Sequence, residues 1–432
     1  MSASRSISAP DDGRLDAGRD ARYSARRYLW DHSAARAGKV INPGLRRCGR
    51  VMHSDVVTVK LSDVGGVRHA GFGGLVTCGS AWSCPVCSAK IAGRRAQEIG
   101  AALSAWTGRG GQVALLTLTM RHHAKRDGEY VALGDLWGGL GAAWHMVTAG
   151  RGWKALQKRY GVGMARVVKS GKHAGETVYA PRIRMIRVVE VTHGKHGWHP
   201  HLHVLMLLPG CATAEELAEL GASIDARWRD SLTEQGFERP GDVGVDVRPL
   251  TDAEVREGWY LTKGSRYSST EALAAEVANG VLKKGRAGNR APFAILDNIR
   301  ALADAGRGGL RQARRDRALW RDWETASRGR RQIAWSAGLR EELKVEVLPD
   351  QEAAELEAGG DVVATLEAGV WAEVRGRHQD FALLRSFEAS MAEGLALLMV
   401  LSEAAGTIRP HRSPGGRRPD GYVTAMVGLL DL

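Results

Sequence analysis

The sequence predicts an α+β fold, because short β-branched runs and longer amphipathic stretches occur in the same chain. Residues 113–120 (VALLTLTM) follow a Gly-Gly break and are typical of a buried strand. The apolar runs 183–192 and 201–208 flank a Gly- and His-rich turn, which predicts two adjacent strands. Residues 213–235 have the apolar spacing of a helix, and residues 242–250 alternate as a strand does.

The other segments are interpreted in chain order. Residues 1–40 are rich in Ser, Arg, Asp and Gly with little periodicity, so we expect a flexible basic leader. Residues 89–106 and 130–147 are predicted helices. The Gly- and Lys-rich segment 150–184 is expected to be a mobile insertion or hairpin, and residues 300–331 an arginine-rich helix.

Composition limits the class of protein. In the 432 residues, Lys and Arg outnumber Asp and Glu by 61 to 48, and the sequence pI is about 9.7. Such an excess suits a polyanionic partner, because neutralised phosphates release condensed counterions. No apolar run approaches the roughly 20 residues that cross a bilayer. The polar N-terminus has no apolar core of a signal peptide, so we expect a cytoplasmic protein without a membrane partner.

Histidines form the most informative motif. In His199-Pro200-His201-Leu202-His203, strand alternation puts the side chains of His201 and His203 on one face. Glu190 lies on the preceding strand and can sit opposite them in a hairpin. Two imidazoles and one carboxylate leave coordination positions open, as a catalytic metal site does. His199 can be a further ligand or orient one.

A tyrosine and a lysine stand three residues apart in a predicted helix. Tyr260 and Lys263 can therefore meet one phosphate. Tyrosine has a pKa of about 10, so it needs a cation to act as a nucleophile at neutral pH. Taken alone, residues 260–263 are better explained by a tyrosine that packs its helix against the sheet. The histidine strand is what favours a catalytic role for Tyr260.

Four of the five cysteines lie in the first quarter of the chain. Cys84-Pro-Val-Cys87 has zinc-knuckle spacing, with Cys78 six residues upstream and Cys48 farther back. Four thiolates make a closed structural zinc site. A redox motif is the rival interpretation, but no thioredoxin-like βαβ pattern surrounds the pair.

Three of these motifs occur in an order that resembles the rolling-circle plasmid replication initiators of the HUH endonuclease class, of the actinomycete-plasmid type. The matching phrases are Leu115-Leu-Thr-Leu-Thr119, His199-Pro-His-Leu-His203 and Tyr260-Leu-Thr-Lys263. Gly288-Asn-Arg290-Ala-Pro292-Phe293 and Gly329 to Ser336 are similar as well. The resemblance covers roughly residues 45 to 340.

The resemblance implies a five-stranded antiparallel sheet that carries the histidines, with the tyrosine helix packed nearby. It implies that Tyr260 nicks single-stranded or hairpin-extruded origin DNA, forming a 5′-phosphotyrosine and a 3′-hydroxyl primer. Mg²⁺ or Mn²⁺ is the expected catalytic ion and Zn²⁺ the structural one. Host helicase and polymerase are expected partners, and homo-oligomerisation is left open.

Termination of replication is less well defined by the sequence. Related initiators often have a water-activating Glu one helical turn before the tyrosine, where this chain has Arg256. Glu257, three residues before Tyr260, is the choice on helical geometry, and Tyr267 is the alternative as a second nucleophile.

The sequence therefore divides into five expected parts. They are a leader (1–40), a zinc-binding module (41–107), the nicking-joining nuclease domain (108–300), an Arg/Trp-rich helical extension (301–345) and a helical C-terminal region of unknown role (346–432). Lys284, Arg286 and Arg290 are expected to contact DNA. Two other functions stay open: a transposase with the same chemistry, and a zinc-ribbon DNA-binding regulator whose histidines are incidental.

Overall fold

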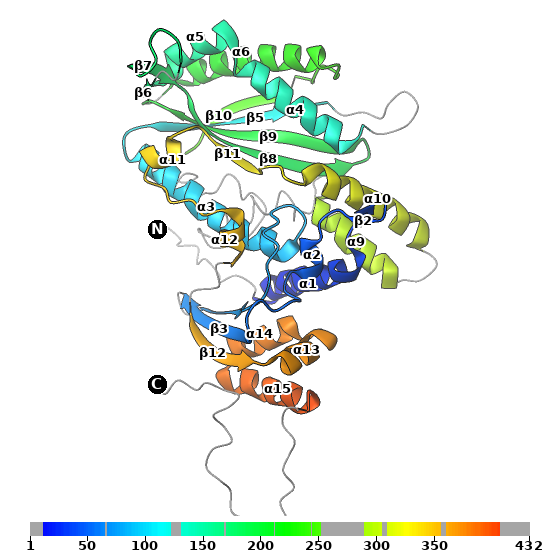
Figure 1. The fold of residues 1–432 in the computed structure, drawn as a ribbon. Helices are drawn as coiled ribbons and strands as arrows, with labels where there is room; N and C mark the ends of the chain where they lie inside the picture. Colours follow the sequence, from blue (N-terminus) through cyan, green and yellow to red (C-terminus); the bar gives the residue numbers. More distant parts are fainter. Residues whose placement is uncertain are drawn as a thin grey trace, which may run out of the picture. The chain divides into compact units, whose positions relative to one another are not determined.

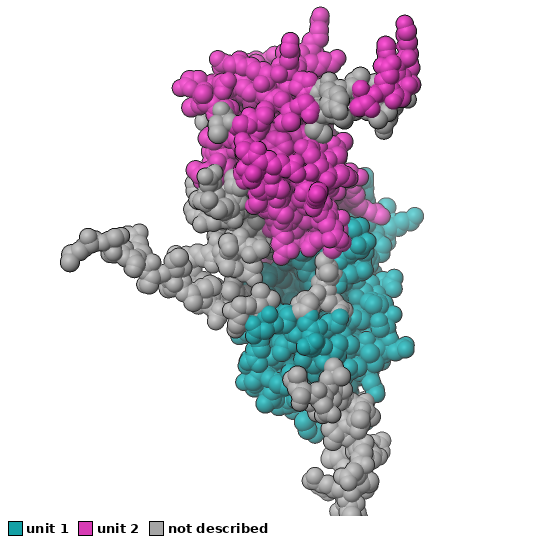
Figure 2. All heavy atoms as spheres, turned by 90° about the vertical axis from the view of Figure 1, so that its left-hand side faces the viewer, with its two compact units in different colours: residues 1–90, 349–432 teal, residues 91–348 magenta. Residues whose placement is uncertain are grey.

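The chain folds into two compact units. The computed structural model describes residues 12–64, 67–121, 131–167, 170–210, 212–242, 244–251, 289–304, 309–355 and 360–406. Unit 1 comprises residues 1–90 and 349–432, and unit 2 comprises residues 91–348 (Figure 2). Each unit has its own antiparallel sheet and its own hydrophobic core.

Unit 2 is built on a five-stranded antiparallel sheet, which confirms the predicted α+β class (Figure 1). The strand order is β10-β5-β9-β8-β11. The strands are β5 (Gln112–Thr119), β8 (Arg184–Gly194), β9 (Gly197–Leu208), β10 (Val245–Pro249) and β11 (Ile333–Trp335). The helices are α3 (Pro85–Thr107, beginning in unit 1), α4 (Leu133–Val147), α5 (Gly150–Tyr160), α6 (Ala214–Glu234), α9 (Pro292–Asp304), α10 (Leu310–Ser327) and α11 (Leu339–Glu342).

Helices cover both faces of this sheet. The apolar side chains of α3 pack on one face, over Leu115, Ile186 and Leu205. Helices α4 and α6 cover the opposite face (Figure 1). Helix α6 begins with a capping box, in which Thr213 and Glu216 each bind the other's backbone N–H.

The β8–β9 hairpin is longer and its turn tighter than the sequence predicts. Strand β8 ends at Gly194 and β9 already begins at Gly197, which has φ +92° and so needs glycine. His196 lies in the turn, whereas His193 and His199 belong to the strands. His193 is buried against the edge of Trp198.

The basic segment 150–184 contains more regular structure than expected. It begins with α5, whose Trp153 and Tyr160 are buried, and continues as the hairpin of β6 (Val162–Val167) and β7 (Thr177–Arg182). The hairpin alternative is thus the one observed, preceded by a helix.

Unit 1 joins the two ends of the chain. Its elements are α1 (Asp12–His32), β1 (Ala35–Arg36), β2 (Lys39–Val40), α2 (Gly44–Arg47), β3 (Val57–Val64), β4 (Val67–Gly73), α12 (Asp350–Glu355), β12 (Asp361–Leu366), α13 (Ala368–Gly376), α14 (Asp380–Ala389) and α15 (Met391–Ala404). Strand β12 pairs with β3, which pairs with β4, so the C-terminal region completes a sheet begun 300 residues earlier.

Two features of unit 1 differ from the sequence-based expectations. Residues 12–32 form a helix, where a flexible leader was expected, because Leu29 and Trp30 bury their side chains. The C-terminal region is not purely helical, because β12 supplies an edge strand. Both differences arise from partners distant in sequence, among them the buried ion pair of Arg26 with Asp380.

Candidate metal centre

Glu190, His201 and His203 lie on one face of the β8–β9 hairpin. Glu190 is directly opposite His201 in the strand register, and His203 lies two residues farther along β9. Residues paired in register share a face, and so do residues two apart in one strand. The local pattern of the sequence is therefore sufficient to bring the three side chains together.

The three side chains converge on one point. The Nε2 atoms of His201 and His203 each lie 3.0 Å from Oε2 of Glu190. The potential ligand atoms are all within 4.8 Å of one another, and the side chains are 12–16% exposed. Each imidazole–carboxylate separation also suits a hydrogen bond donated by a ring N–H to the carboxylate. Such hydrogen bonds can hold the three side chains together without a metal ion.

The donor set fits a divalent cation. Neighbouring ligands about 2.1 Å from an octahedral ion are about 3.0 Å apart, which is the separation between each imidazole and the carboxylate. Imidazoles suit transition metals such as Mn²⁺, and the carboxylate suits Mg²⁺ and Mn²⁺ alike. Three protein ligands leave room for water or a phosphate oxygen.

Thr117 orients one of the histidines. It lies on β5 directly opposite His203, and its Oγ1 is 3.3 Å from Nδ1 of that ring. This contact turns Nε2 of His203 toward Glu190, as outer partners of metal-binding histidines commonly do. The Nδ1 atom of His201 is buried and has no hydrogen-bond partner among the described residues.

His199 lies on the same face but outside the three-residue group. It pairs with Thr192 in the register, and its ring centroid is 5.4 Å from that of His201. The arrangement brings together three of the four residues that the sequence suggested as ligands.

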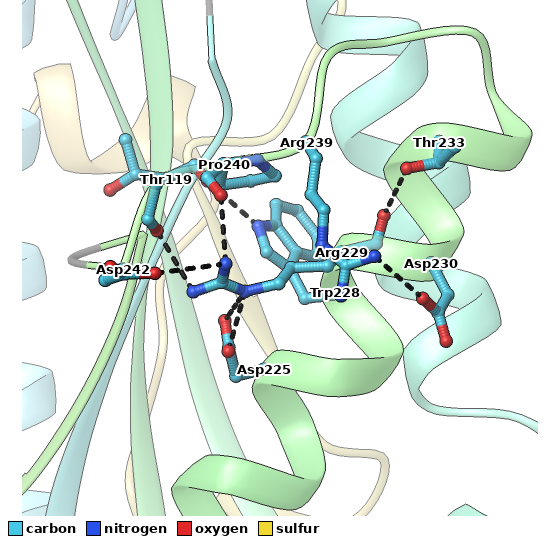
Figure 3. Close-up of polar contacts among 10 residues, drawn as sticks. Thr119, Asp225, Trp228, Arg229, Asp230, Thr233, Arg239, Pro240 and Asp242 are labelled. Atoms are coloured by element: carbon cyan, nitrogen blue, oxygen red, sulfur yellow. Dashed lines mark hydrogen bonds and ion pairs between the residues drawn. The ribbon is translucent and has the colours of Figure 1, made fainter.

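Helix α6 fixes the end of β5 near the histidines. The buried Trp228 donates its indole N–H to the carbonyl of Thr119, 2.9 Å away (Figure 3). The next residue, Arg229, binds Asp225 and the carbonyls of Pro240 and Gly241. These contacts attach α6 to residues 240–241, which precede β10. Strand β10 is the neighbour of β5 in the sheet.

Helix α10 braces the tip of the hairpin from the other face of the sheet. Trp198, next to His199, donates its Nε1–H to Oδ2 of Asp322 at 2.6 Å. Its ring stacks on Trp323 with centroids 5.9 Å apart, and Trp323 in turn contacts Trp137 of α4. The hairpin tip therefore has a fixed position relative to α10.

Arg290 also forms part of this support. Its backbone forms two hydrogen bonds with that of His193, and its guanidinium binds the fully buried Asp316 at 2.8 Å. The structure thus gives Arg290 a buried protein partner, whereas the sequence suggested a contact with DNA. The other expected site residues lie outside the described residues: Tyr260, Lys263, Glu257, Tyr267, Lys284 and Arg286.

A second cluster, in unit 1, contains the four expected cysteines. Cys48 follows α2, Cys84 precedes α3 and Cys87 lies in its first turn. The Sγ atom of Cys48 is 3.6 Å from that of Cys84 and 3.4 Å from that of Cys87, and Cys78 is 3.7 Å from Cys87. A disulfide needs about 2.0 Å between sulfurs. Ligands about 2.3 Å from a tetrahedral zinc ion are about 3.8 Å apart, so the donor set fits zinc.

The pKa values of these thiols differ, because the thiols are buried and share hydrogen bonds. Hydrogen bonds from the three neighbouring thiols lower the pKa of Cys87 well below its usual value. Burial raises the pKa of Cys84. Thiols that share protons in this way can exchange them for a metal, because the ligand form of cysteine is the thiolate.

Sequence reasoning did not identify Thr117 or Asp322. The alternation of Thr117 and Thr119 within the first strand motif is a signal for a polar strand face. Its meaning depends on the pairing of β5 with β9, which are more than 80 residues apart. Asp322 has no local signal, since its partner Trp198 lies on a distant hairpin.

The fold and this site define an α+β protein with a His-His-Glu cluster on a central antiparallel sheet. Over 389 residues the chain is 31% identical to a "Protein rep" of Streptomyces lividans, covering 78% of this chain and 82% of that protein. The chain therefore belongs to the family of this Rep protein.

A second similarity covers less of the chain. A "Neomycin resistance protein" of Streptomyces cyanogenus is 30% identical over 226 residues, which is 51% of this chain and 49% of that protein. No protein-family model and no solved structure matches the chain. Within the described ranges, no helix has both the length and the apolar character needed to span a membrane.

Proposed function

We propose that this Rep-family chain initiates rolling-circle replication of a plasmid by nicking one strand of origin DNA. The observation that carries the proposal is the convergence of Glu190, His201 and His203 on adjacent antiparallel strands. An incidental polar strand face would not require three side chains to converge within 4.8 Å, and this favours a nuclease over a non-catalytic DNA-binding regulator. Membership of the Rep family favours replication over transposition.

In the proposed reaction, the phenolic oxygen of Tyr260 attacks the scissile phosphorus. A bond forms from the tyrosine oxygen to the phosphorus at the 5′ end of the downstream strand, and the bond from that phosphorus to the 3′ oxygen of the upstream strand breaks. That oxygen takes up a proton and becomes the primer hydroxyl, while the phenol loses one. A Mg²⁺ or Mn²⁺ ion held by Glu190, His201 and His203 would supply Lewis-acid polarisation of the phosphate.

Other residues of the chain assist the proposed reaction. Lys263 neutralises charge on the attacked phosphate, and Thr117 keeps the His203 ring in its ligand orientation. Lys284 and Arg286 contact the DNA backbone. Glu257 activates the water that ends the reaction, with Tyr267 as the alternative second nucleophile.

The test is a cleavage assay on single-stranded DNA from the protein's own replicon, with Mn²⁺ or Mg²⁺ and then with EDTA. We expect a covalent protein–DNA adduct on a denaturing gel that requires metal and is lost in Tyr260→Phe. Tyr267→Phe is the matched control, and it should still form the first adduct. Strong DNA binding without an adduct under every metal would refute the nuclease and leave a DNA-binding regulator.

We also propose that Cys48, Cys78, Cys84 and Cys87 hold a structural zinc ion. Elemental analysis should find one equivalent of zinc in the wild type and a clear loss in Cys84→Ser. Cys211→Ser is the matched control, because Cys211 is the one cysteine outside the cluster. An equal zinc content in all three proteins would contradict the assignment.

A further inference from the structure

Helix α10 exposes its arginines and keeps its acidic side chains buried or half-buried. Its arginines Arg311, Arg314, Arg315, Arg317 and Arg321 are all exposed; together they are called the arginine stripe below. None of the three carboxylates of the helix is exposed. Asp316 and Glu324 are buried, and Asp322 binds the indole of Trp198.

This arrangement leaves the positive charge of the stripe unbalanced within the helix. Asp316 accepts hydrogen bonds from Arg290 and Asn298, which lie outside α10, and from Gln312 of the same helix. No ion pair between a stripe arginine and a described carboxylate occurs in the structure. A solvated helix surface usually mixes both signs of charge, so five exposed arginines without an exposed acid on the same helix indicate an anionic partner.

The stripe has a fixed position relative to the candidate metal centre. The same helix holds the hairpin tip through Asp322 and through the stacking of Trp323 on Trp198. Trp198 is adjacent to His199 and three residues from His201. A ligand bound along the stripe would therefore be held at a constant distance from the histidine strand.

We propose that the arginine stripe binds the phosphate backbone of duplex DNA flanking the nick site. Arg311 and Arg321 are ten residues apart, or about 15 Å along a helix, a span that faces several phosphates of a duplex. Both tryptophans of α10, Trp320 and Trp323, are buried. The exposed side thus has charge without a stacking platform, which suits paired DNA better than unpaired bases.

This inference rests on the proposed function, because it concerns the DNA that the nuclease would cut. Its test is separate. Binding of a short fluorescent duplex of arbitrary sequence is measured by anisotropy over a range of NaCl concentrations, with no divalent metal present. Each phosphate contact contributes about 0.9 to the slope of log K against log[salt] for duplex DNA and about 0.7 for a single strand.

The variant is Arg311→Gln/Arg314→Gln/Arg315→Gln. We expect its duplex slope to fall by up to about 2.7, while the three Arg→Lys replacements keep most of the slope. The matched control, Arg151→Gln/Lys154→Gln/Lys158→Gln, removes the same charge from exposed positions of α5 in the same unit and should keep the wild-type slope. Circular dichroism checks that each variant is folded.

Three results would overturn the proposal: an unchanged slope in the α10 variant, an equal loss in the α5 control, or a loss seen only with single-stranded DNA. The outcome is independent of the nicking chemistry. If the wild type forms no covalent adduct, the proposed nuclease is refuted. If the α10 variant then still has a smaller salt slope than the wild type, DNA binding by the arginine stripe is supported.

Discussion

Two threonines on one face of β5 lie opposite the two histidines, but a hydrogen-bonding contact is formed by only one of these pairs. Thr117 is opposite His203 and contacts its Nδ1 atom, whereas Thr119 is opposite His201, whose Nδ1 has no partner among the described residues. Only one ring of the centre is thus oriented by a neighbouring hydroxyl. Loss of a group that orients a metal-binding histidine typically changes metal affinity by 10- to 100-fold.

Thr117→Val should therefore weaken Mn²⁺ binding by about tenfold, because the His203 ring loses the contact that sets its orientation. The measurement is isothermal titration calorimetry of the full chain. Thr119→Val makes the same change two residues away on the same strand face and should bind Mn²⁺ as the wild type does. Equal affinities in the two variants would show that the Thr117 hydroxyl has no orienting role.

At the scale of elements, the β8–β9 hairpin depends on α10 for support at its tip. The Nε1–H of Trp198 is bonded to the carboxylate of Asp322, a charge-assisted contact in a half-buried environment. Hydrogen bonds to charged groups contribute about 1.5–3 kcal/mol, and the carboxylate would lose a donor if the indole were removed. The hairpin tip should therefore be sensitive to this one bond.

Trp198→Phe is expected to lower the free energy of unfolding of unit 2 by about 2 kcal/mol, from the lost bond and the smaller ring. Urea unfolding followed by circular dichroism measures the change. Trp320→Phe, on α10 itself, is the matched control, because the buried Nε1 of Trp320 has no partner among the described residues. The prediction fails if Trp320→Phe is as destabilising as Trp198→Phe.

The elements that the sequence predicted well are those whose signals are local. Strand alternation around His201 and its closeness to Glu190 in sequence were enough to predict the hairpin and the convergence of Glu190, His201 and His203 on one face. The spacing of Cys84 and Cys87 likewise indicated the thiol cluster. Strand alternation and motif spacing involve only a few neighbouring residues, so they can be recognised in a single sequence.

The elements that were missed depend on distant partners. Helix α1 has a polar, arginine-rich composition, and its burial follows from contacts with α14 rather than from its own pattern. Strand β12 is short and completes a sheet whose other strands lie near the N-terminus. The role of Asp322 follows only from the packing of α10 against the hairpin.

At the scale of the whole molecule, unit 1 is assembled from both ends of the chain. Asp380 of α14 is fully buried and binds Arg26 and Arg27 of α1. Arg26 is buried as well, and an added side chain at Gly49, which has φ +60°, would collide with its guanidinium. The ion pair therefore links the C-terminal region to the segment that carries Cys48.

Asp380→Asn should destabilise unit 1 by about 3–5 kcal/mol, because it leaves the buried Arg26 without its counter-charge. Differential scanning calorimetry of the full chain would detect a lower melting temperature for one of two transitions. The matched control is Glu373→Gln, which breaks the more exposed pair with Arg377 and should cost less than about 1 kcal/mol. Similar losses in both variants would argue against a special role for the buried pair.

Mn²⁺ binding by the full chain tests the metal centre most directly, because it needs no knowledge of the origin sequence. Titration followed by electron paramagnetic resonance should show one Mn²⁺ bound in the wild type and none in His201→Gln/His203→Gln at the same concentrations. The thiol cluster prefers softer ions, so it should not contribute. Unchanged Mn²⁺ binding in the double variant would contradict a metal site at Glu190, His201 and His203, and with it the proposed nicking chemistry.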